Sequence, residues 1–78
     1  MSEGAVLEQD PDTFVRQLVE FAAASGVGMR EHFRMAKVWL RDPTATQRAF
    51  AARSTLKEHQ VLDLLRALTR DLETMGAA

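Results

Sequence analysis

Two glutamate–histidine pairs are the only positions at which this sequence could hold a metal ion or an acid–base pair. Glu31 precedes His32, and Glu58 precedes His59. Neighbouring residues on a helix point about 100° apart, whereas metal ligands on a helix usually lie three or four positions apart and share one face. A site would need His32 and His59 to meet across helices or across a dimer axis. We therefore expect surface or boundary histidines and no metal site.

The rest of the sequence carries no catalytic or cofactor motif. It has no glycine-rich phosphate loop, no nucleophile motif, no pair of catalytic acids and no zinc-ligand spacing. Cysteine is absent, which excludes disulfide bonds and thiolate metal sites. These absences predict a protein that is not an enzyme and that binds no cofactor.

The amino-acid composition predicts an all-α fold. The 78 residues include nine leucines, twelve alanines and four methionines, but no isoleucine and no tyrosine. Leucine, alanine and methionine favour helices, whereas the residues that favour strands are scarce. A chain of this length has a small interior, so without disulfides its stability depends on dense packing or on association with another chain.

Turn and cap residues place the first two helices. Asp10-Pro11 is typical of a helix start and predicts a helix over about 11–24, after a flexible tail over 1–9. Two glycines then interrupt the apolar pattern and predict a turn. A second helix follows over about 29–41.

The remainder of the chain, over about 46–75, is expected to form either one long helix or two. Asp42-Pro43 closes the preceding helix, because a residue that precedes proline is disfavoured in a helix, and it opens the next one. No proline or glycine interrupts this segment, but a Thr-x-x-Glu capping-box pattern follows Ser54 and indicates a break near that residue. All the helices are assigned to a single domain over 10–76.

The sequence offers more apolar surface than a bundle of short helices can bury. The second helix has large apolar residues on two faces, and the last helix has a wide leucine stripe. Apolar surface that cannot reach the interior must be covered by another chain. We therefore predict a bundle of three to four helices, completed by homodimerisation through the last helix. Four residues are expected in the core: Phe14, Leu18, Phe33 and Leu65. Six residues are candidates for the interface: Trp39, Met35, Val61, Leu65, Leu68 and Leu72.

The segment 21–27 resembles the first helix and turn of the helix-turn-helix family of DNA-binding motifs. Ala22 fits the small residue inside the first helix, Gly26 fits the turn glycine, and Val27 fits the apolar residue that follows. The resemblance implies that 29–37 is the recognition helix. Its implied DNA contacts are Arg30, Arg34 and Lys37.

Charge and departures from the motif make DNA binding the alternative rather than the main expectation. The net charge is −1, and the basic residues gather in 27–57 between two acidic ends. His32 stands where the motif turns an aliphatic residue inward, and Gly28 and Met29 replace polar residues. We expect a small helical protein–protein interaction or assembly module that binds itself or another protein. The alternative is a small helix-turn-helix DNA-binding regulator.

Targeting signals are also absent from the sequence. No run of residues is long and apolar enough to span a membrane, and the first residues lack the charge and apolar run of a signal peptide. We therefore expect a cytoplasmic protein that does not interact with membranes.

Overall fold

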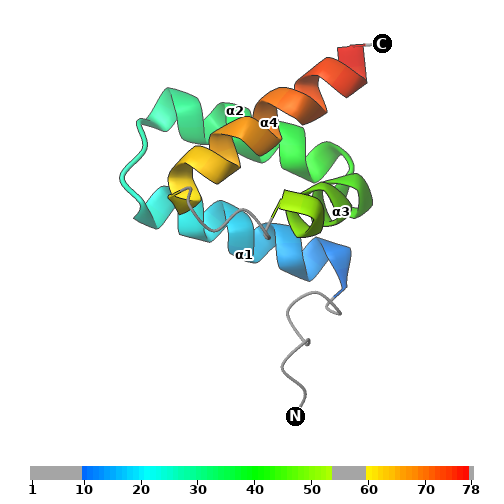
Figure 1. The fold of residues 1–78 in the computed structure, drawn as a ribbon. Coiled ribbons are helices and arrows are strands. Elements are labelled where there is room, and N and C mark those ends of the chain that lie inside the picture. The colour runs from blue at the N-terminus through cyan, green and yellow to red at the C-terminus, as the bar shows by residue number, and fades with distance from the viewer. Residues whose placement is uncertain (1–9, 54–59, 78) are drawn as a thin grey trace.

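Four α-helices make up the part of the chain that the computed structural model describes, residues 10–53 and 60–77. They are α1 (Pro11–Ala24), α2 (Met29–Arg41), α3 (Pro43–Arg53) and α4 (Val61–Ala77) (Figure 1). Neither described stretch contains a strand, which confirms the all-α prediction. The predicted N-terminal tail and the capping-box pattern lie outside the described residues.

α1 and α3 begin with the same local structure. At the start of α1, the Asp10 carboxylate accepts a hydrogen bond from the backbone N–H of Thr13 at 3.3 Å. At the start of α3, the Asp42 carboxylate accepts one from the backbone N–H of Ala45 at 3.1 Å. In both helices a proline follows, whose missing N–H leaves no donor unpaired. α3 therefore begins at Pro43, earlier than the predicted start at about 46, because the same dipeptide ends α2 and starts α3.

The C-terminal part of the chain forms two helices, so the single long helix is wrong. α3 ends at Arg53, next to the predicted break. α4 begins after Gln60, whose carbonyl accepts a hydrogen bond from the backbone N–H of Leu64 at 3.0 Å. α3 and α4 pack against each other, which one continuous helix could not do.

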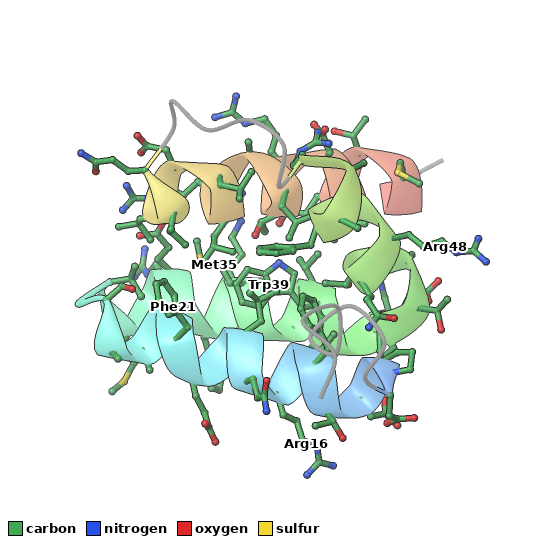
Figure 2. The ribbon with its side chains drawn as sticks, turned by 60° about the horizontal axis from the view of Figure 1, so that its bottom comes forward. Arg16, Phe21, Met35, Trp39 and Arg48 are labelled. Atoms are coloured by element: carbon green, nitrogen blue, oxygen red, sulfur yellow. The ribbon has the colours of Figure 1, made fainter. Side chains whose placement is uncertain are left out.

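α1 and α2 lie side by side and run in opposite directions (Figures 1 and 2). The turn between them contains Gly26, whose φ of 84° is in the left-handed region that favours glycine. α3 packs mainly on α1 and α4, and α4 packs on α2 and α3. No helix in the described residues is both long enough and apolar enough to cross a membrane.

The core lies between the helices, with Trp39 of α2 fully buried inside it (Figure 2). The ring of Phe14 packs edge-on against that of Phe50, with the ring centroids 5.3 Å apart, and this contact joins α1 to α3. Phe14, Leu18 and Leu65 are in the core, as predicted. The buried cluster consists of Phe14, Val15, Leu18, Ala22, Met35, Val38, Trp39, Leu65, Leu68 and Leu72.

Candidate functional site

The outer face of α2 carries large apolar side chains that residues 10–53 and 60–77 leave uncovered. Met29 is 83% exposed, Phe33 is 75% exposed and Leu40 is 48% exposed. These three residues, which we call the apolar stripe, follow helical spacing and share one side of α2. The core prediction for Phe33 is wrong because α2 turns a different face, with Met35 and Trp39, toward the other helices.

A second stripe on α2 is basic and runs beside the apolar stripe. Its residues recur every three or four positions from the first turn of α2 to the last, so they share one side of the helix. This side faces the C-terminal half of α4, where Glu73 lies. The basic stripe consists of Arg30, Arg34, Lys37 and Arg41.

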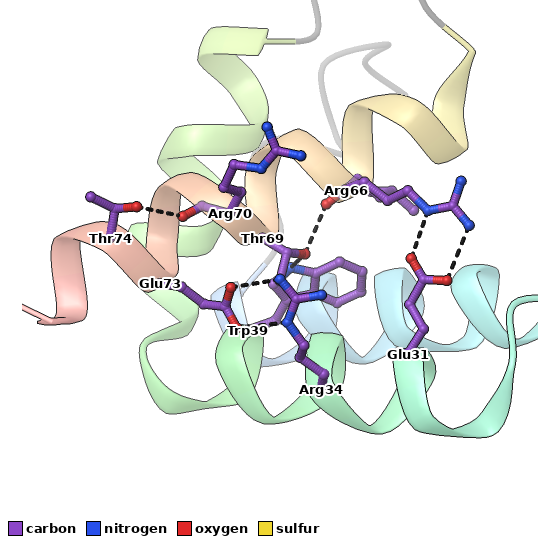
Figure 3. A network of polar contacts seen from close by, with 9 residues as sticks. Glu31, Arg34, Trp39, Arg66, Thr69, Arg70, Glu73 and Thr74 are labelled. Carbon is purple, nitrogen blue, oxygen red and sulfur yellow. Dashed lines mark hydrogen bonds and ion pairs between the residues drawn. The ribbon is translucent and has the colours of Figure 1, made fainter.

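Two reciprocal ion pairs join α2 to α4 (Figure 3). Arg34 of α2 donates two hydrogen bonds to the Glu73 carboxylate of α4, at 2.8 and 2.7 Å. Arg66 of α4 donates two to the Glu31 carboxylate of α2, at 2.6 and 3.0 Å. Hydrogen bonding to the guanidinium groups lowers the pKa of both carboxylates below its ordinary value. The two pairs connect α2 and α4 on the surface, where exposed ion pairs contribute little to stability.

Buried hydrogen bonds anchor the inner face of α2. The Trp39 indole N–H donates to the Thr69 hydroxyl at 3.0 Å, and that hydroxyl donates to the carbonyl of Leu65 at 2.8 Å (Figure 3). The Thr46 hydroxyl lies 3.1 Å from the Trp39 carbonyl and 3.0 Å from the Asp42 carbonyl. The polar groups around the indole therefore have partners, and α2 is held firmly while its outer face stays open.

A groove of about 640 Å³ lies between the basic stripe and the C-terminal half of α4. Phe33 and Val38 give it an apolar lining, while Glu73 and Gly76 form its α4 side. The Arg41 guanidinium lies against the backbone at Gly76, and a Cβ at position 76 would push it aside.

Five of the six predicted interface residues lie in the core of the single chain. Their side chains are covered by the chain's own helices, so a surface on the folded protein must consist of other residues. Val61 is 47% exposed and lies beside Phe21, at a smaller apolar hollow of about 200 Å³. Exposed large apolar side chains therefore lie at both ends of α4, at Val61 and Met75, while α2 carries three that share one face. The five core residues are Trp39, Met35, Leu65, Leu68 and Leu72.

The three predicted DNA contacts lie together on the basic stripe, but they are not equivalent. Arg30 and Lys37 are exposed, whereas Arg34 is held by Glu73. The left-handed Gly26 matches the turn of a helix-turn-helix motif. However, α1 and α2 run antiparallel (Figure 1), whereas the helices of that motif cross at about 90–120°.

The histidines form no metal site in the described part of the chain. His32 is half-buried, and its Nε2 atom is buried without a hydrogen-bond partner among the described residues. His59 lies outside those residues. No three histidine, aspartate or glutamate side chains in residues 10–53 and 60–77 gather where they could hold a metal ion.

Some residues of the groove escaped prediction from sequence. Arg41 continues the spacing of Arg30, Arg34 and Lys37, so this spacing could have identified it. Glu73 had no comparable signal, because its partner is 39 positions away in the sequence.

Comparison with known proteins provides no family or homologue for this chain. No protein-family model matches it, and no curated protein or solved structure is significantly similar to it. The function must therefore be argued from the geometry of the chain itself.

Proposed function

We propose that this protein is a non-catalytic helical module that binds another protein through the apolar stripe of α2. The observation that carries the proposal is the exposure of Met29 and Phe33 on one face of a helix whose opposite side is well packed. Exposed apolar groups that lie together on a small protein are typical of an interaction site.

The residue types of the stripe suit protein binding. An exposed aromatic ring such as Phe33 can supply a large contact area when it enters a pocket, and aromatic residues are enriched at the centres of interfaces. Methionine has a flexible, polarisable side chain that adapts to the shape of a partner. Because the core is complete without these side chains, the stripe is free to take part in binding.

The features of α2 favour a protein partner over DNA. Arg34 is paired with Glu73, so only two of the three implied DNA contacts, Arg30 and Lys37, are left for phosphate groups. The antiparallel packing of α1 and α2 also differs from the arrangement that presents a recognition helix to the major groove. The partner we propose is therefore a protein, and DNA serves as an alternative outcome of the test.

Site-specific photo-crosslinking in the native host tests this proposal. A benzophenone amino acid is placed at Phe33 and, as a control, at Arg16, an exposed position on α1 (Figure 2). We expect a discrete protein adduct from position 33 that is absent from position 16 and is lost when Met29→Glu is added. An adduct that nuclease removes would instead indicate DNA binding. Equal labelling at both positions, or none at position 33, would overturn the proposal.

A further inference from the structure

We infer that the partner segment is an amphipathic helix with an acidic flank, which lies along α2 over the groove between α2 and α4. This inference rests on the proposed docking function and specifies the chemistry of the partner. It follows from the apolar stripe, the basic stripe and the groove, which adjoin one another on α2.

The length of the two stripes matches a helical ligand. The apolar stripe extends from Met29 to Leu40, which corresponds to about three turns and roughly 16 Å of helix. The basic stripe covers the same length, from Arg30 to Arg41. Peptide helices that bind in grooves present apolar anchors three, four and seven positions apart, and such anchors would meet the stripe turn by turn.

The charge of the groove selects an acidic partner. Arg30 and Lys37 have no ion-pair partner among the described residues, and both are exposed. The groove is lined by four basic side chains and by a single acid, Glu73, which is already engaged with Arg34. Carboxylates on one flank of a bound helix would lie over Arg30 and Lys37 while its apolar residues contact Phe33.

A second copy of α2 does not supply that charge. The acidic residue of α2 is Glu31, and its carboxylate is held by Arg66. Two α2 helices that met through their apolar stripes would therefore bring two basic stripes to the same interface without a free carboxylate from either helix. Like charges at an interface oppose association, so the complementary partner is a different, acidic helix.

The shape of the groove favours a helix over a membrane surface. Val38 lines its floor between α2 and α4, and the α4 wall carries Glu73 and Gly76. A concave site with an acidic residue on one wall fits a helix that carries its acidic residues on one flank only. A flat array of phosphates would face the Glu73 carboxylate as well as the basic stripe.

A displayed peptide library tests the partner chemistry directly. Each member is a 15-residue helix, roughly four turns, with leucine at the anchor positions and randomised flanking positions. It is selected on the whole protein and on Arg30→Glu/Lys37→Glu, with Arg16→Glu/Arg48→Glu as the matched control. Arg16 and Arg48 are exposed cations that project away from Trp39 and the core (Figure 2).

We expect wild type and the control to enrich aspartate and glutamate on one flank, and the groove variant to enrich lysine and arginine instead. Fluorescence anisotropy on the enriched acidic peptide should then show binding at least tenfold weaker to Phe33→Ser, with an unchanged circular dichroism spectrum. Selection without a charge preference, or acidic selection that persists in the groove variant, would overturn the inference. So would wild-type binding to phosphatidylserine vesicles or duplex DNA with no enriched helix.

The two proposals fail in different ways. A protein adduct at position 33 together with no acidic preference in the library overturns the acidic helix but supports the docking function. Absence of the adduct overturns the docking function itself, whatever the library selects.

Discussion

Met29 and Met35 are the same residue type on the same helix, six positions apart, yet their exposed fractions are 83% and 1%. The first belongs to a face of α2 that none of the four described helices covers, and the second to a face that packs against the rest of the bundle. The difference shows that the two sides of α2 are in different environments: the inner side packs in the core, and the outer side, where we propose that a partner binds, is in contact with water. Substitutions on the inner side of α2 should therefore lower the stability of the fold, whereas substitutions on the outer side should leave it unchanged.

Trp39→Ala tests the inner face with the largest expected effect. Removal of a fully buried aromatic ring leaves a cavity and takes away the donor that pairs with Thr69. Such changes cost about 3–5 kcal/mol, against roughly 4–12 kcal/mol for the total stability of a chain of this length. Thermal denaturation followed by circular dichroism should show a strongly lowered melting temperature for Trp39→Ala, whereas Phe33→Ala should melt like wild type. Equal melting of both variants would mean that the two faces do not differ.

The two methionines give a matched pair for the same comparison. Met35→Ala should lower the free energy of unfolding by about 2–5 kcal/mol, because it creates a cavity in the core. Met29→Ala should change it by no more than about 0.5 kcal/mol, because its side chain is already in water. Urea denaturation of the two variants measures both values. A similar loss in both would contradict the assignment of the outer face to binding.

Thr69→Val tests the inner face of α2 through a single hydrogen bond, the one between Trp39 and Thr69. Valine keeps the shape of threonine but cannot accept the Trp39 indole N–H, which would stay buried without a partner. The expected loss is about 1–3 kcal/mol. Thr74→Val is the control, because the exposed Thr74 hydroxyl donates to the Arg70 carbonyl at 3.0 Å, whereas the Thr69 hydroxyl also accepts from a buried donor. If Thr74→Val lowered the free energy of unfolding as much as Thr69→Val, the loss would come from the replacement of a helical threonine and not from the unpaired indole N–H.

The ion pairs between α2 and α4 should give the smallest effect, which appears in acid. The pKa values of Glu31 and Glu73 are lowered in the folded state, so their contribution is fully present above the ordinary carboxyl pKa of about 4.3. It is lost as the pH falls below that value and through the lowered pKa values. The interval from pH 5 to pH 3 spans about one unit on either side of that value. Over this interval, the urea midpoint of wild type should therefore fall more than the urea midpoint of Glu31→Gln/Glu73→Gln. Parallel curves for the two proteins would show that the pairs add no stability.

Local signals predicted much of the fold. Asp10-Pro11 located the start of α1, and the two glycines located the turn before α2. The same Asp-Pro dipeptide at Asp42-Pro43 indicated both the end of α2 and the opening of another helix, but α3 begins at Pro43 itself and not at about 46. A repeated signal at two places in one chain has the same physical meaning at both, because the cap and the proline act within a single turn.

The candidate site was harder to predict because its geometry depends on distant residues. Periodicity identified two apolar faces on α2 but could not decide which one would face the core, so Phe33 was assigned to the wrong side. That choice depends on the contacts of Trp39 with Thr69, 30 positions away in the sequence. The same reason applies to α4: spacing indicates that Leu65 and Leu68 share a face, but not that the chain's own helices cover it.

The single tryptophan of the protein is also a natural optical reporter. Trp39 is fully buried and hydrogen-bonded, so its fluorescence in the folded protein should differ in wavelength from that of an indole in water. A ligand on the outer face of α2 leaves the indole inside the core, whereas unfolding exposes it. Emission from one unlabelled sample can therefore distinguish a variant that has lost its partner from one that has lost its fold.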